Sequence, residues 1–192
     1  MRILPLAVAA TLSLSAFAGQ ALAYQAGDVY VRGEFEKSDL ASAKFSRESG
    51  FAIAGGYLIT DMLGVELGIG EKLEHDFQLD AGDAGSLDRM PVNLLLQYYP
   101  LGGIEDARVQ PFVGVGVNYT RFSGVSTAGL SVDNDYGFAG QVGMDLVITD
   151  NLSATSFARY TEVDATFESG GETVEKVRLD PLTVGAGITY RF

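Results

Sequence analysis

The chain has 192 residues with 25 acidic and 13 basic side chains, no cysteine and a single histidine. A net charge of −12 argues against nucleic acid or an anionic lipid surface as the partner, and the lack of cysteine excludes disulfides and thiolate sites. After the N-terminal segment, no stretch reaches the roughly 20 uninterrupted apolar residues that a helical membrane span needs, which excludes a helical membrane protein.

The first 23 residues have the pattern of an export signal. Arg2 is followed by an apolar run over 3–17, and Ala21-Leu22-Ala23 has the small residues of a cleavage site. We therefore expect residues 1–23 to be a cleaved signal peptide and residues 24–192 to form one domain. The expected mature domain has 12 basic against 25 acidic residues, because Arg2 is lost with the signal.

Eight later segments alternate apolar and polar or small residues with a period of two. In chain order they are 28–35, 51–59, 65–72, 90–98, 112–119, 135–146, 152–163 and 182–192. The last is the clearest, with apolar residues at even positions from Leu182 to Phe192 and small or polar ones between them. In a soluble sandwich the apolar set fills a core, whereas in a membrane barrel it faces lipid and the polar set faces the lumen.

The seventh segment, 152–163, has the weakest alternation. An arginine that faces lipid near the bilayer midplane costs about 2–4 kcal/mol. We therefore expect Arg159 to face the lumen, and Ala154, Ala158 and Tyr160 to face outward.

The connections between the segments decide between sandwich and barrel. Those over 37–49, 73–88, 123–134 and 165–175 are long, whereas those over 60–63, 100–107 and 149–151 are shorter. Alternating long and short connections predict an all-β fold, an eight-stranded antiparallel transmembrane β-barrel with up-and-down order and both termini periplasmic. The acidic stretch 71–89 is expected to be a solvated loop.

Aromatic residues lie near the expected strand ends, where they suit the two membrane interfaces. They are Tyr57, Tyr98, Tyr99, Tyr119, Phe122, Tyr136, Tyr160, Tyr190 and Phe192.

Polar and charged residues of the inward set are the candidate lumen-lining residues. They are Arg32, Glu66, Gly68, Lys72, Asn93, Gln97, Asn118, Gln141, Asp145 and Arg159, with Arg191 near the C-terminus. Eight strands leave an interior that side chains nearly fill, so opposite charges there are expected to pair. Two interpretations remain, a structural lattice of ion pairs and a selective polar channel.

Other candidate sites have weaker support. His75, between Glu74 and Asp76, fits a solvated loop better than a metal site, and no spacing selects it with Ser86 or Ser126 as a catalytic pair. A set of oxygen-bearing side chains lacks the spacing of a calcium loop, although it suits transient divalent bridging to lipopolysaccharide phosphates; its members are Asp80, Asp83, Asp133, Asn134 and Asp135. We expect neither an enzyme nor a bound metal or cofactor.

Several segments resemble the OmpW family of bacterial outer-membrane proteins. They include Gly64-Val65-Glu66-Leu67, the run 109–120 (VQPFVGVGVNYT), the run 177–181 (VRLDP) and the terminal Tyr190-Arg191-Phe192. The resemblance implies a narrow barrel that passes small hydrophobic molecules into the membrane through a sideways opening between strands. It also implies that Tyr190 and Phe192 form the signal that the outer-membrane assembly machinery reads.

The sequence departs from that family at two inward positions. Relatives have a leucine where this chain has Gly68 and a tryptophan where it has Arg159. We expect Arg159 to pair with Glu66 or Asp145, and the channel to take small hydrophobic or amphipathic molecules. The alternative function is a sealed structural or surface-interaction barrel that acts through acidic extracellular loops.

Overall fold

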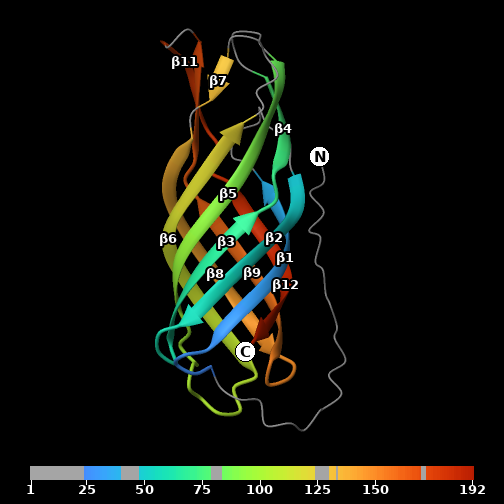
Figure 1. Cartoon of the computed structure of the whole chain (residues 1–192), viewed down its shortest axis with the longest axis vertical. Coiled ribbons are helices and arrows are strands. Elements are labelled where there is room, and N and C mark those ends of the chain that lie inside the picture. The colour runs from blue at the N-terminus through green and yellow to red at the C-terminus, as the bar shows by residue number, and fades with distance from the viewer. Residues whose placement is uncertain (1–23, 40–47, 79–83, 124–129, 133, 170–171) are drawn as a thin grey trace, which may run out of the picture.

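A computed structural model describes residues 24–39, 48–78, 84–123, 130–132, 134–169 and 172–192, and all its regular elements are strands (Figure 1). Eight of them are β1 (Val29–Asp39), β2 (Glu48–Leu58), β3 (Leu63–Gly70), β5 (Ala84–Tyr98), β6 (Val109–Ser123), β8 (Asp135–Val147), β9 (Leu152–Thr161) and β12 (Leu182–Arg191). Each pairs antiparallel with the next of the eight, and β1 pairs with β12 from Tyr30↔Arg191 to Asp39↔Leu182. The sheet is therefore closed, and the predicted eight-stranded meander is confirmed.

Four further strands extend beyond the barrel at the end that carries the long connections (Figure 1). β4 (Leu73–Gln78) pairs with the first residues of β5, and β7 (Leu130–Val132), β10 (Asp164–Ser169) and β11 (Glu172–Arg178) form a separate small sheet. The expectation of a solvated loop over 71–89 was therefore wrong for residues 73–78 and 84–89, which form strands. A strand pair continues through that stretch, because the antiparallel ladder gives its backbone groups partners beyond the barrel wall.

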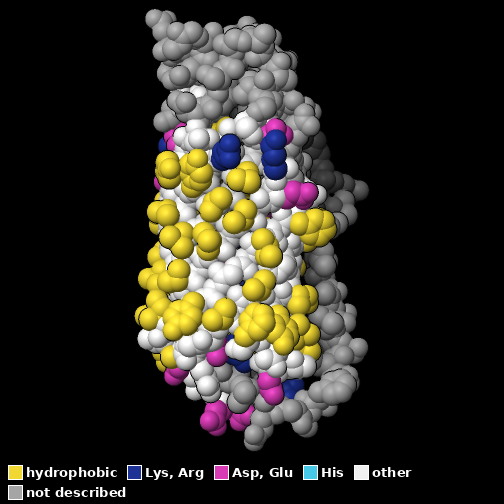
Figure 2. Space-filling view, in the orientation of Figure 1, with side chains coloured by type: hydrophobic (Ala, Val, Ile, Leu, Met, Phe, Trp, Pro, Cys, Tyr) yellow, Lys and Arg dark blue, Asp and Glu magenta, His cyan; other side chains and the backbone are white. Residues whose placement is uncertain are grey.

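The side chains alternate between lumen and outer surface as the period predicted. On β6, for example, Phe112, Asn118 and Thr120 are buried, while Val115 and Val117 are more than half exposed. Figure 2 shows the exposed apolar side chains as a broad band around the middle of the visible face, with charged side chains beyond it at both ends. No helix among the described residues has the length and apolar character to cross a membrane.

Two members of the predicted aromatic girdles lie inside instead. Tyr99 is 0% and Phe122 is 6% exposed. Tyr99 lies two residues beyond Gln97, and Phe122 two residues beyond Thr120, so each continues the inward set of its strand. The other seven are partly or fully exposed, as a girdle requires.

The opposite end of the barrel, here called the short-turn end, is closed by tight turns. In two of them a threonine hydroxyl accepts a backbone N–H three residues on, Thr60 from Leu63 at 3.0 Å and Thr149 from Leu152 at 3.1 Å. The C-terminal Phe192 lies at this end, where its N–H donates to the carbonyl of Val29. Threonine suits such turns because its hydroxyl bonds nearby backbone.

Candidate lumen site and wall pocket

An apolar cluster closes the lumen at the short-turn end. It comprises Tyr24, Leu58, Tyr99, Phe112 and Phe157, all at most 6% exposed. The Tyr24 and Tyr99 rings meet edge to face with centroids 5.0 Å apart, and Tyr99 contacts Phe112 at 5.4 Å. Its four aromatics come from four different strands or connecting segments, so the cluster links parts of the barrel that are distant in sequence.

Tyr24 reaches into this cluster from the segment before β1. Its hydroxyl donates to Oδ2 of Asp145 at 2.6 Å, and the Arg191 guanidinium lies 4.9 Å from its ring centroid. Burial raises the pKa of the Tyr24 hydroxyl well above its usual value. The hydroxyl therefore stays protonated and remains a donor to the carboxylate.

Above the cluster, Arg32 lies at the centre of a buried polar network. Its side chain is fully buried, and Nη1 donates to Glu66 Oε2 at 2.7 Å while Nε donates to Thr189 at 2.8 Å. Asp145 Oδ2 and Glu34 Oε1 each lie 3.5 Å from the guanidinium. Side chains from four strands, β1, β3, β8 and β12, thus contact or form part of one buried cationic group.

Glu66 extends the network toward the apolar cluster. Its two carboxylate oxygens accept from Tyr30 at 2.8 Å and from Gln97 Nε2 at 2.9 Å, and Tyr99 donates to the Gln97 carbonyl at 2.7 Å. Buried charges are costly unless paired and hydrogen-bonded, and here each oxygen of Glu66 has a donor. In this layer Arg32, Glu34, Glu66, Gln97 and Asp145 are all at most 3% exposed, so buried polar side chains occupy the lumen at this level.

Arg159 forms a second layer nearer the long-loop end. Its Nε donates to Gln141 Oε1 at 2.6 Å, Nη1 donates to Glu36 at 2.9 Å, and Glu34 lies 3.6 Å away. The inward orientation of Arg159 is confirmed. Its predicted pairing with Glu66 or Asp145 was wrong, because both carboxylates pair with Arg32 and Arg159 pairs with Glu36 instead.

Of the remaining residues predicted to line the lumen, all but one lie inside the barrel. Asn93 and Asn118 are bonded at 2.8 Å, and Thr120 donates to Asn118 at 2.6 Å. Gly68 is also inward, and a Cβ there would meet only the Cβ of Ala54 at 3.8 Å, so the position has open space. Lys72 is not in the lumen.

Lys72 lies on the outer surface because β3 ends at Gly70 before the inward alternation reaches it. Its side chain is 56% exposed, and its ammonium pairs with Asp88 at 2.7 Å. The prediction of Lys72 as a lumen residue was therefore wrong.

The same irregularity opens the barrel wall. Ile69 pairs with Val92 and Leu73 pairs with Arg89, so three residues, 70–72, lie opposite two, 90 and 91. On the other side the β2–β3 ladder ends at Ala52↔Gly70, with one more backbone bond from the N–H of Glu71 to the carbonyl of Phe51 at 2.8 Å. Pro91, which has no N–H to donate, lies within this break.

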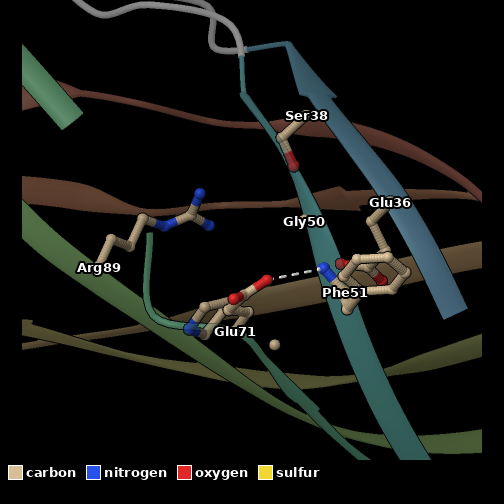
Figure 3. A pocket seen from close by; sticks show the side chains of 8 residues that line it. Glu36, Ser38, Gly50, Phe51, Glu71 and Arg89 are labelled. Carbon is tan, nitrogen blue, oxygen red and sulfur yellow. Dashed lines mark hydrogen bonds between the residues drawn. The ribbon is translucent and has the colours of Figure 1, made fainter. Parts of the chain in front are cut away.

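A small pocket occupies the break in the wall (Figure 3). Its lining includes inward Glu36 and Arg89, outward Phe51, and Glu71. The Glu71 carboxylate accepts the N–H of Phe51 at 3.2 Å and so spans the gap between β2 and the end of β3. The enclosed space is about 20 Å³, room for a water molecule or two.

Sequence reasoning missed several residues that this arrangement uses. Glu34, Glu36 and Tyr99 share the inward alternation of residues already selected, so that signal was present. Tyr24 lies in an irregular segment where no periodicity applies, and its position follows only from the fold. The side chains of His75 and Ser86, and residues Asp80, Asp83, Ser126 and Asp133, lie outside the described residues.

Comparisons with known proteins agree on the family and the fold. The sequence model of the OmpW family matches residues 14–192. Outer membrane protein W of Salmonella typhi is 31% identical over 209 residues, which cover 96% of this chain and 98% of that protein.

Solved structures give the same result. The solution structure of Escherichia coli outer membrane protein W is 26% identical, with a TM-score of 0.68, over 88% of this chain and all of that one. The crystal structure of OprG from Pseudomonas aeruginosa has a TM-score of 0.73 at 24% identity, covering 88% and 98% of the two chains, and supports the fold alone.

Proposed function

The chain belongs to the OmpW family of outer-membrane β-barrel proteins, and we propose that it conducts small amphipathic molecules from the long-loop end sideways through its wall. In this proposal the long-loop end faces the cell exterior and both termini face the periplasm. The observation that carries the proposal is the pocket in the wall, at the point where the β2–β3 ladder ends and above the buried side chains of the lumen.

The filled short-turn half supports a lateral exit over an axial one. An axial route to the periplasm would have to displace the Arg32 network and the apolar cluster beneath it. A lateral route has to move the side chains of Glu71 and Arg89, which line the wall pocket, and to break the one backbone bond between Glu71 and Phe51. The first displacement breaks several buried charged contacts, and the second moves side chains at the edge of the lumen.

The chemistry of the upper lumen supports an amphipathic solute with an acidic head. Arg89 and Arg159 are at most 5% exposed. Gln141 Nε2 is buried without an acceptor among the described residues, and it lies beside Arg159. A carboxylate could accept from these donors while an alkyl tail leaves past Phe51, which is 67% exposed on the outer face.

Uptake into liposomes tests the proposal. Purified barrel is reconstituted, and uptake is compared for a short-chain carboxylate, the matching alcohol and an alkane-like solute. Wild type should favour the carboxylate and the alcohol over the alkane-like solute. Glu71→Ala, which removes the carboxylate that spans the gap, should raise uptake of all three.

Arg89→Ala should lower carboxylate uptake relative to the alcohol by on the order of tenfold, the worth of one charge-assisted hydrogen bond. Glu105→Ala, an exposed acid in the turn after β5, is the matched control for Glu71. If wild type and Arg89→Ala both take up the carboxylate, the alcohol and the alkane-like solute equally, the preference for an acidic head group is refuted.

A sealed structural or surface-interaction barrel is the second candidate, favoured by the ion-pair layers that fill the lumen. If neither wild type nor Glu71→Ala takes up any of the three solutes, this second function stands and the channel is refuted.

A further inference from the structure

A small basic pocket lies on the outer wall near the long-loop end. It is lined by Lys72, Met90, Arg121 and Ser123. Met90 and Arg121 are direct partners across the β5·β6 pairing, and Arg121 is exposed while its neighbours Thr120 and Phe122 are buried. The pocket therefore faces the surroundings of the barrel and is separate from the lumen.

Along the barrel axis, the basic pocket lies at the edge of the apolar band. Arg121 lies two residues beyond Tyr119, whose ring packs on Tyr136 at 4.7 Å. Arg121 follows Val109, the first residue of β6, by twelve residues. At about 3.3 Å per residue and a tilt of about 40°, that run spans about 30 Å, more than the height of about 25 Å of the apolar band. Arg121 thus lies at the level of lipid headgroups, as do the basic side chains beyond the apolar band in Figure 2.

The two cationic side chains of the pocket differ in whether a carboxylate pairs with them. Lys72 is held by Asp88 at 2.7 Å, which fixes its ammonium beside the pocket. Arg121 has no hydrogen bond or ion pair among the described residues. A guanidinium fork is well suited to phosphate oxygens, and a nearby ammonium adds a second donor.

We propose that this pocket binds the phosphate of an anionic lipid headgroup in the leaflet at the long-loop end. The net charge of −12 opposes any general attraction to an anionic surface, so binding depends on this local arrangement. Met90 supplies apolar contact for the part of the lipid next to the phosphate. Solute transport is not needed for this inference, whereas the choice of lipid A as probe rests on the proposed orientation, in which the long-loop end faces the exterior.

Native mass spectrometry of the full barrel in zwitterionic detergent tests the proposal. The barrel is titrated with lipid A carrying its phosphates, with dephosphorylated lipid A and with inorganic phosphate. Wild type should bind phosphorylated lipid A saturably, the dephosphorylated lipid at least fivefold more weakly, and inorganic phosphate not measurably. Arg121→Gln should weaken binding about fivefold and Lys72→Gln with Arg121→Gln more, since each cation near a membrane surface contributes on that order.

Lys37→Gln is the matched control. Lys37 is an exposed lysine on β1, two residues beyond Phe35 on the outward face, so it lies at a similar height but outside the pocket. It should change binding less than twofold. Arg121→Lys should bind more tightly than Arg121→Gln, and every variant should keep the far-UV spectrum of wild type.

Four results would overturn the inference. They are unchanged binding by the double variant, an equal loss in Lys37→Gln, equal binding of the dephosphorylated lipid, and binding of inorganic phosphate as tight as that of the lipid. The uptake assay is independent of all four, so failure here leaves the proposed channel untouched.

Discussion

Replacing Arg32 by methionine removes the cation shared by three buried carboxylates. The guanidinium lies 2.7 Å from Glu66 and 3.5 Å from both Asp145 and Glu34, and its side chain is fully buried. Hydrogen bonds to charged groups contribute about 1.5–3 kcal/mol each, and removing one partner of a buried pair costs about 3–5 kcal/mol. We therefore expect Arg32→Met to lower the free energy of unfolding by about 3–5 kcal/mol.

The assay is urea-dependent unfolding of the barrel in liposomes, followed by far-UV circular dichroism because the chain has no tryptophan. Arg32→Met combined with Glu66→Gln and Asp145→Asn should recover most of the loss, since neutral partners no longer leave buried charge unpaired. Lys37→Met, an exposed cation, should change stability by less than about 0.5 kcal/mol. If Arg32→Met unfolds at the same urea concentration as Lys37→Met, the network does not stabilise the barrel and the reasoning fails.

Three further predictions concern the wall and the C-terminus. Gly116→Ala should destabilise by about 1–3 kcal/mol because a Cβ there would lie 1.9 Å from the carbonyl oxygen of Leu94, whereas Gly33→Ala, with nothing within 4 Å, should be neutral in the same urea assay. Val115→Lys should cost about 2–4 kcal/mol if the site faces lipid near the midplane, while Val115→Leu should cost almost nothing, and equal costs would contradict its outward orientation. Phe192→Ala should slow insertion by the assembly machinery, measured as the rate at which the heat-modifiable band appears, and Phe192→Tyr should not; equal rates for wild type and Phe192→Ala would remove its role as assembly signal.

The sequence by itself determined the eight barrel strands and the orientation of most of their side chains. A period of two follows from strand geometry alone, so the outward position of Val115 and the inward position of Asn118 could be predicted without any tertiary contact. The penalty for a charge in lipid placed Arg159 inside even where the alternation was weak. The threonine turns were likewise local, because a hydroxyl three residues from its donor needs no distant partner.

Only the tertiary structure decided which inward charges meet. Arg32 and Asp145 are 113 residues apart in sequence, yet their side chains meet in the lumen. Strand tilt and register together bring them to the same height. The same register left Arg159 with Glu36, and the break after Gly70 moved Lys72 outside. The position of Tyr24 in the apolar cluster also depended on the closed barrel, because the segment before β1 has no alternation from which the orientation of a side chain could be predicted. Periodicity fixes the face on which a side chain lies, but height along the axis and the identity of the opposite wall depend on how all eight strands are staggered when the sheet closes.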